Sequence, residues 1–301
     1  MPRYYGEEPE IFAIKSSDGK ITYLEMPRQA VEVQGLAMPP MEHRTARAPF
    51  QHGETYLGFS LTPRPIQVTM HMRGCNRYNM YEMRRDFIDL INPLVGKLRF
   101  RVSFRNGDIF ELHNVVYDAG FDVGTNNQPE PTVQRFGARF IAYDPVWYKW
   151  PQNVDTSTLG SLSELVFPAT FPIHFDTAGI ETTITIPLQG NWLSFPELEL
   201  TGPMNRPTIT NLDTEEKLEL SYKIPAGKSA TISTQFGNKT VESSDGTNLL
   251  GYLTPDSDLA TFHMDPDPIV DGGLNNIHLR ATECTAASTF YIRWFDRVLG
   301  L

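Results

Sequence analysis

Carboxylate side chains are concentrated in one short stretch, DPDPIVDGG, at positions 265–273. Asp265, Asp267 and Asp271 lie close together there, and Ca²⁺ prefers such oxygen ligands. The spacing departs from the EF-hand loop, because Ile269 stands at its fifth position. We therefore expect a solvated loop here, with a calcium site as the weaker alternative, and we predict no other metal site.

A second pair of carboxylates, Glu197 and Glu199 in PELEL, lies on one face of a predicted strand, as the two acids of a glycosidase do. Simple alternation on a half-exposed strand produces the same pattern. The sequence has no G-x-x-x-x-G-K-[ST], G-x-S-x-G or H-E-x-x-H motif. We therefore predict no enzyme, no catalytic residues and no cofactor.

The cysteines and histidines also give no metal-binding pattern. Cys75 and Cys284 are far apart in the sequence, and two free, buried thiols are the ordinary expectation for a protein folded in a reducing cytosol. His43 and His52 share one segment but are not expected to bind zinc. The start, MPRYYGEEPEIFAI, has no apolar run that could serve as a leader segment, and no window of about 18 apolar residues occurs, so we expect neither a leader segment nor a membrane span.

Charge is distributed unevenly between the two halves of the 301 residues. Residues 1–150 carry 18 Lys and Arg, 14 of them Arg, against 17 Asp and Glu, whereas residues 151–301 carry 8 against 19. Arg is enriched at protein–protein interfaces because its planar guanidinium group pairs with carboxylates and stacks on aromatic rings. The first half is therefore expected to present an interaction surface, with an ordinary solvated surface that happens to use Arg as the alternative. A net charge of −10 disfavours specific nucleic-acid binding.

The first half reads as an α+β domain, residues 1–150, of antiparallel strands with one helix. Residues 11–26 form a hairpin about Ser17-Asp18-Gly19, and Asn106-Gly107 marks a second hairpin. Between them, a helix is expected to follow Asn76 or Asn79 and to end at Asn92-Pro93. Its apolar stripe comprises Met80, Met83, Phe87, Leu90, Ile91 and Leu94.

Residues 38–55 show no apolar period, contain several prolines and are expected to form a long loop. Loops of this length in compact domains are usually functional or ordered by a partner. This segment, together with the polar face of the helix, which is either solvated or part of an interface, supplies the candidate interface. Its candidate residues are Arg44, Arg47, His52, Arg77, Arg84 and Arg85.

The stretch ARFIAYDPVWYKW, 138–150, ends the first domain. Asp144-Pro145 interrupts a strand, because Pro145 has no amide hydrogen for the ladder. Trp147, Tyr148 and Trp150 are then expected to fix the exit of the chain by packing against the domain they leave. Two alternatives stay open, namely that they are simply core residues or that some of them seat against a neighbouring subunit.

The second half is expected to be all β. Residues 151–195 are interpreted as a linker or strand-exchange region, because prolines recur between short apolar runs. Residues 196–301 hold about nine short segments separated by turn signals, which indicates a β-sandwich, most simply a jelly roll. The predicted strands include TNLLGYL at 247–253 and LATFHM at 259–264.

This order of features resembles the distal tail protein family of long-tailed, non-contractile bacteriophages. The shared features are a strand, helix and hairpin, the strand that ends at 140–148, the start of the second domain and the closing sandwich. The quoted segments are RPIQVTMHMRG (64–74), KLRFRVSFRNGDIFEL (97–112), FIAYDPVWY (140–148) and PELELTGPMNRPTITN (196–211). The sequence departs from the family near 265–273, where a longer segment replaces a compact turn.

The resemblance implies a structural protein of the virion tail rather than an enzyme. It implies a homo-oligomeric, six-fold ring built by the first domain, with a galectin-like second domain. The implied partners are the tail tube protein and tail-tip hub or receptor-binding proteins, and DNA would pass through the ring. An alternative function is carbohydrate binding by the sandwich, for which the candidate aromatic residues are Tyr222, Phe236, Tyr252 and Phe262.

Overall fold

The computed structural model describes residues 9–25, 28–121, 132–158 and 180–301. The chain divides into two compact units. One comprises Met1–Trp150 with Val298–Leu301, and the other comprises Pro151–Arg297. The predicted fold class is confirmed, since the protein is mainly β, with one α+β unit and one unit of stacked antiparallel sheets. No helix in the described ranges is long and apolar enough to cross a membrane.

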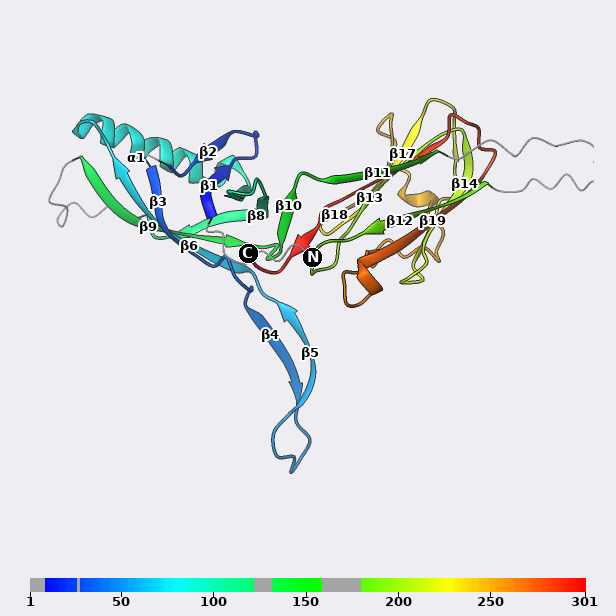
Figure 1. Ribbon diagram of the computed structural model, residues 1–301, viewed down its shortest axis with the longest axis horizontal. Helices are drawn as coiled ribbons and strands as arrows, with labels where there is room; N and C mark the ends of the chain where they lie inside the picture. The colour runs from blue at the N-terminus through cyan, green and yellow to red at the C-terminus, as the bar shows by residue number, and fades with distance from the viewer. Residues whose placement is uncertain (1–8, 26–27, 122–131, 159–179) are drawn as a thin grey trace, which may run out of the picture. The chain divides into compact units, whose positions relative to one another are not determined.

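The first unit is built on a nine-stranded antiparallel sheet (Figure 1). Both predicted hairpins are present, and Gly107 supplies the positive φ of 89° that its turn requires. The main strand order is β2-β1-β7-β8-β9-β6-β3, with β10 beside β8 and β21 beside β10. The strands are β1 (Pro9–Lys15), β2 (Ile21–Tyr23), β3 (Arg28–Gln34), β6 (Arg64–Arg73), β7 (Leu98–Phe104), β8 (Ile109–Ala119), β9 (Val133–Ala142), β10 (Trp147–Trp150) and β21 (Arg297–Val298).

Helix α1 (Arg77–Ile91) packs its apolar side into the core of this unit. The Asn76 side chain caps its first turn by accepting a hydrogen bond from the Asn79 amide at 2.8 Å. Met80, Met83, Phe87 and Ile91 are buried, as predicted. Leu94 is 92% exposed and was wrongly assigned to the stripe, because Pro93 starts a short 3₁₀ turn, η1 (Pro93–Val95), that turns the chain away.

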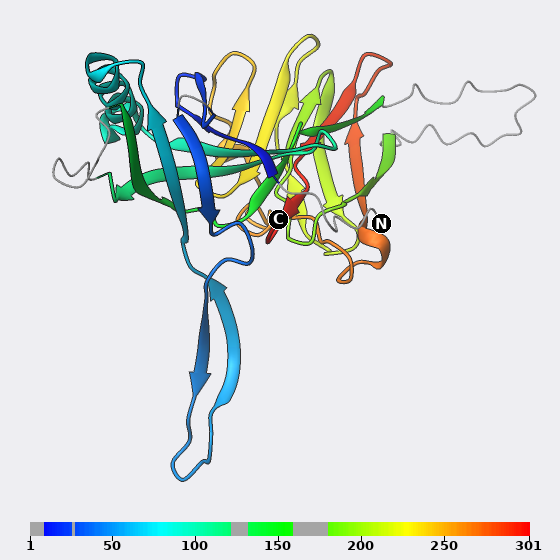
Figure 2. The same cartoon turned by 60° about the vertical axis from the view of Figure 1, so that its left-hand side comes forward.

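The predicted loop at 38–55 is wrong. Its residues begin a β-hairpin made of β4 (Met41–Ala46) and β5 (Thr55–Leu61), which pair only with each other among the described strands. Figures 1 and 2 both show this hairpin extending away from the sheet of the first unit. Neither β4 nor β5 contributes a residue to the apolar core of the first unit.

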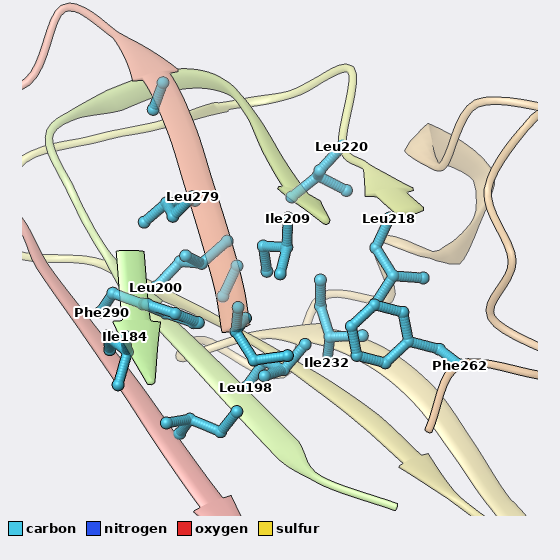
Figure 3. Close-up of a cluster of buried hydrophobic side chains, with 14 of the residues drawn as sticks. Ile184, Leu198, Leu200, Ile209, Leu218, Leu220, Ile232, Phe262, Leu279 and Phe290 are labelled. Carbon is cyan, nitrogen blue, oxygen red and sulfur yellow. The ribbon is translucent and has the colours of Figure 1, made fainter. Parts of the chain in front are cut away.

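The second unit contains two antiparallel sheets that enclose one apolar core (Figure 3). Two of its strands, β11 and β12, come from the segment 151–195. One sheet has the order β11 (Asn153–Thr158), β20 (Thr289–Trp294), β13 (Glu197–Thr201), β17 (Ser229–Gln235) and β18 (Asn238–Ser243). The other has β12 (Ile180–Pro187), β19 (Leu274–Thr282), β14 (Met204–Asn211) and β15 (Lys217–Glu219), with β16 (Lys223–Ile224) beside β14.

Two predicted strands of this unit are not strands. Residues 247–253 contain the 3₁₀ turn η2 (Leu250–Tyr252), and residues 259–264 form a turn with one isolated bridge from Met264 to Ser194. Their apolar residues still serve the core, because Leu249, Phe262 and Met264 are fully buried. A second 3₁₀ turn, η3 (Asp271–Gly273), precedes β19.

Candidate subunit interface

The β4–β5 hairpin is amphipathic. Met41 lies opposite Leu61, His43 opposite Phe59 and Thr45 opposite Tyr56. Residues directly opposite each other in an antiparallel pair share one face, and successive residues alternate between faces. One face therefore carries Met41, Leu61, His43, Phe59 and Tyr56, and this set is called the apolar hairpin face below.

Solvent reaches this face along its length. Tyr56 is 58% exposed, Phe59 is 49% exposed and Met41 is 41% exposed. The opposite face carries Glu42, Arg44, Ala46, Thr55 and Ser60. The hairpin thus has the alternating pattern of a half-buried ribbon, but its apolar side is half open to water.

A second exposed patch lies on the outer side of α1. Tyr78, Tyr81, Arg85 and Ile88 are all exposed and recur at helical spacing, so they form one stripe on the side opposite the buried stripe. The guanidinium carbons of Arg77 and Arg84 lie 5.9 Å and 5.1 Å from the centre of the Tyr81 ring. Tyr and Arg of this kind are enriched among residues that dominate binding at protein interfaces.

The six predicted interface residues fall on these two elements. Arg44 lies on the polar face of the hairpin, and Arg47 donates to the Gln51 carbonyl at 3.2 Å inside its connecting loop. His52 is exposed in the same loop. The candidates chosen from the sequence include the cations and leave out the apolar residues between them, because polar residues dilute the alternation in β4 and a register shift interrupts it in β5.

The aromatic residues at the domain exit separate onto two sides of β10. Trp147 is fully buried in the core of the first unit, and its indole nitrogen donates to the Leu36 carbonyl at 3.1 Å. Tyr148 stacks on the His113 ring with centroids 4.1 Å apart, and its hydroxyl donates to Asp144. The Nζ of Lys15 and the guanidinium carbon of Arg101 each lie 5.8 Å from the centre of the Trp150 ring. These contacts are all made within the unit that the strand leaves.

Tyr148 and Trp150 flank a buried carboxylate. Glu111, on β8, lies opposite Tyr148 and is 1% exposed. The Nε of Arg101 donates to Glu111 Oε1 at 2.8 Å, and the Nη1 of Arg99 lies 3.5 Å from Oε2. Burial alone raises the pKa of Glu111, but the contact with His113 at 3.6 Å and the hydrogen bonds and charge of Arg101 outweigh it, and the pKa falls to about 2.

This lowered pKa predicts a loss of stability in acid. A carboxylate whose pKa is lower in the folded state stabilises the fold above its unfolded pKa, near 4.5, and loses that contribution as the pH falls towards 2. A shift of this size corresponds to about 3 kcal/mol at neutral pH. Urea unfolding should therefore show Glu111→Gln to be destabilised at pH 7, with the gap to the wild type closing between pH 4.5 and 2.

The control for this prediction is Asp86→Asn, which changes a 65% exposed carboxylate paired with Arg28. It should cost less than about 1 kcal/mol at every pH, because exposed ion pairs contribute little. A gap between Glu111→Gln and the wild type that stays constant from pH 7 to pH 2 would contradict the assignment.

The three candidate calcium ligands do not come together as a site. In the described ranges, no group of three His, Cys, Asp or Glu side chains is placed to hold a metal ion. The Asp265 carboxylate lies 3.2 Å from His263 Nε2, and the Asp265 amide donates to the buried Asn275 side chain at 2.9 Å. The two cysteines are free thiols, and Cys75 is exposed, contrary to the expectation that both are buried.

Glu197 and Glu199 are held by one arginine. Arg293, on the neighbouring strand β20, donates from Nη1 to Glu197 at 3.0 Å and from Nη2 to Glu199. These hydrogen bonds, that of Glu199 first, raise the pKa of the Arg293 guanidinium. The arrangement is a cross-strand ion-pair ladder, which explains the pair without a catalytic role.

The four candidate sugar-binding aromatic residues have different environments. Phe262 is fully buried in the core of the sandwich. Phe236 is exposed and packs edge-on against Phe195 at 4.6 Å. Tyr222 and Tyr252 form a pair with ring centres 5.1 Å apart, and Tyr252 is half exposed.

The first unit combines a sheet, one covering helix and an amphipathic hairpin. Residues 11–128 match the phage tail protein RIFT-related domain. The resemblance to phage distal tail proteins that the sequence indicated is thereby confirmed, and structural likeness to such a protein extends over nearly the whole chain. No curated protein sequence matches the chain.

Two solved structures share the fold. The first is the crystal structure of the Dit protein (gp 19.1) of phage SPP1, described as a paradigm of the hub adsorption apparatus in phages that infect Gram-positive hosts. It is 13% identical with a TM-score of 0.63, and the match covers 96% of this chain and 99% of that one. The second is a chain of the phage p2 baseplate in its activated conformation with Sr, 11% identical with a TM-score of 0.53, covering 94% and 97%.

Proposed function

We propose that this chain is a distal tail protein that forms a hexameric ring and connects the tail tube of a siphovirus-type phage to its tail-tip apparatus. The RIFT-related tail domain at 11–128 and the fold shared with SPP1 Dit support this role. The proposed partners are the tail tube protein on one side and hub or receptor-binding proteins on the other. The protein would be made in the bacterial cytoplasm and reside in the virion tail.

The hairpin is the single observation that carries the ring. A two-stranded hairpin alone in water is marginally stable, and it becomes stable when its apolar face packs against another surface. In the described structure β4 and β5 pair only with each other, and Met41, Phe59 and Tyr56 of the apolar hairpin face are 41–58% exposed within one chain. The occupant that fits is a second copy of this chain, since a repeated contact of this kind builds a closed assembly from one gene product.

The contact would be heterologous. A ring requires one patch of each copy to dock on a different patch of the next copy. The hairpin supplies the first patch, and the Tyr78–Tyr81–Arg85–Ile88 stripe of α1 is the candidate for the second. Both patches lie within the first unit, so this unit alone would form the ring.

The charge of the first half suits a passage for DNA. Its 18 cations and 17 acids nearly cancel, so a channel lined by this half would neither hold nor repel phosphate strongly. The acidic second half would then be free for contacts with other tail proteins.

Size-exclusion chromatography with light scattering tests this proposal. We expect a mass several-fold above the 34.1 kDa of one chain, independent of dilution over the micromolar range. A mass of 34.1 kDa at all concentrations would reject the ring.

A second candidate function is carbohydrate binding by the Tyr222–Tyr252 pair. A half-exposed aromatic ring is a suitable stacking surface for a sugar, and the half-exposed Tyr252 lies 5.1 Å from the partly buried Tyr222 ring in the second unit. Calorimetry of the full chain against a panel of cell-wall sugars tests it, with Tyr252→Ala as the control. Absence of heat at millimolar sugar would remove this candidate.

A further inference from the structure

Arg64 is a buried cation whose hydrogen-bond acceptors, among the described residues, are all backbone carbonyl groups, and its guanidinium carbon lies 5.6 Å from the centre of the Trp147 ring. It is the first residue of β6 and is 1% exposed. Its guanidinium donates to Pro145 at 2.7 Å, to Gly35 at 2.8 Å and to Leu36 at 3.2 Å, and also to Ala37 and Leu299. In the described part of the chain its guanidinium bonds to carbonyl oxygens and not to a carboxylate.

This arrangement keeps a positive charge inside the unit. Burial lowers the pKa of Arg64 to about 10, so the group remains protonated at neutral pH. A buried charge is tolerated only where its donors are satisfied, and the planar guanidinium offers five N–H groups in a fixed geometry. Lysine, with one compact ammonium group, could not reach the same set of carbonyls.

The carbonyl groups that Arg64 collects lie at the root of the hairpin. Gly35–Ala37 connect the end of β3 to β4, and Arg64 follows β5 by three residues. The residues that flank the hairpin are also bonded directly, because the amide of Thr62, just after β5, donates to the carbonyl of Pro40, just before β4, at 3.0 Å. Arg64, which follows β5, therefore holds the segment that leads into β4, so the two ends of the hairpin are linked through its side chain.

The remaining partner comes from Val298–Leu301, called the return segment here. The Leu301 amide donates to the Leu36 carbonyl at 3.1 Å, and the Val298 and Leu301 side chains pack against the core of the first unit. Gly300 passes so close to Ala37 that a Cβ built on it would lie 2.9 Å from the Ala37 carbonyl carbon. The return segment thus covers the same three residues, 35–37, that Arg64 holds.

We propose that Arg64 and the return segment position the β4–β5 hairpin, so that the hairpin is fixed for docking only when residues 298–301 are seated on its root. The consequence for docking rests on the proposed ring. Because residues 298–301 follow the second unit in the chain, the root is completed only after the second unit has been synthesised. Chains that end earlier would therefore carry a poorly fixed hairpin and would be excluded from the ring.

Hydrogen–deuterium exchange at a concentration where the protein is monomeric tests the positioning directly. Three variants remove different parts of the contact, namely truncation after Arg297, Gly300→Val and Arg64→Lys. Each should speed exchange of the Thr62 amide by about tenfold or more, as local opening of the root becomes easier. Exchange of the Val68 amide, in the centre of β6, should change little in the truncation and in Gly300→Val.

The matched control is Arg139→Lys, which makes the same chemical change at a half-exposed arginine on β9 that pairs with Asp118 on β8. It should leave exchange of the Thr62 amide unchanged. If Arg64→Lys does not fold, the other two variants still decide the matter, because neither alters a buried charge.

The outcomes separate this inference from the ring itself. If the variants exchange the Thr62 amide faster than the wild type and also lose the oligomer, both the inference and the ring are supported. If the variants exchange it faster but the wild type is itself monomeric, the positioning is supported and the ring is rejected. Unchanged Thr62 exchange in the truncation and in Gly300→Val would overturn the inference, whatever the oligomeric state.

Discussion

Phe59→Asp is expected to convert the ring into monomers while leaving the fold intact. Phe59 lies at the middle of the apolar hairpin face, opposite His43, and is 49% exposed within one chain. A buried aromatic residue at an interface typically contributes about 2–4 kcal/mol, and a carboxylate placed there also adds desolvation. Light scattering should give the monomer mass, with a circular dichroism spectrum equal to that of the wild type.

Ser60→Asp is the matched control. Ser60 is the next residue in β5 and points to the opposite face of the same hairpin, opposite Glu42. The added charge and its distance from the root are nearly the same, and only the face differs. The control should remain a ring. If Ser60→Asp dissociates the ring as completely as Phe59→Asp, the apolar face is not the contact.

Phe262→Ala is expected to have the largest effect on stability. Phe262 enters the sandwich core from a turn and packs beside Ile232 and Leu218, as Figure 3 shows. Removing a fully buried phenyl ring leaves a cavity and typically costs about 3–5 kcal/mol. The second unit should therefore unfold at a clearly lower temperature in calorimetry, while the transition of the first unit stays in place.

Phe236→Ala gives the comparison for this variant. Phe236 is 68% exposed and touches Phe195 and Lys239, so its truncation should cost less than about 1 kcal/mol. Equal destabilisation by the two variants would contradict the assignment of Phe262 to the core.

The helix and the regular strands could be predicted from the sequence because their own core specifies them. Alternation of Ile66, Val68, Met70 and Met72 marked β6, and Asn92-Pro93 marked the end of α1. The β4–β5 hairpin could not be recognised in the same way. Its residues Glu42, His43 and Arg44 are polar on both sides of the ribbon, and the alternation is diluted because no surface within the chain buries it.

The turns of the sandwich show the opposite failure. Residues 247–253 and 259–264 are apolar, and apolar runs of this length read as strands. In the structure these residues fill the core from irregular backbone, which short-range pattern cannot distinguish from a strand. Their burial was foreseeable and their backbone conformation was not.

The role of Arg64 also lay beyond sequence reasoning. Its partners are carbonyl groups from three separate segments, and a carbonyl group carries no signature in the sequence. The aromatic cluster after Asp144-Pro145 was located correctly, but the buried Glu111 beneath Tyr148 gave no signal, because an acid in an alternating strand is normally exposed.

Electron micrographs of the purified chain give the most direct test of its role as a ring-forming tail protein. Class averages should show closed rings with six-fold symmetry around a central opening, and the Phe59→Asp variant should yield only monomers. A wild-type sample made up of monomers at micromolar concentration, with the apolar hairpin face open to solvent, would contradict the account.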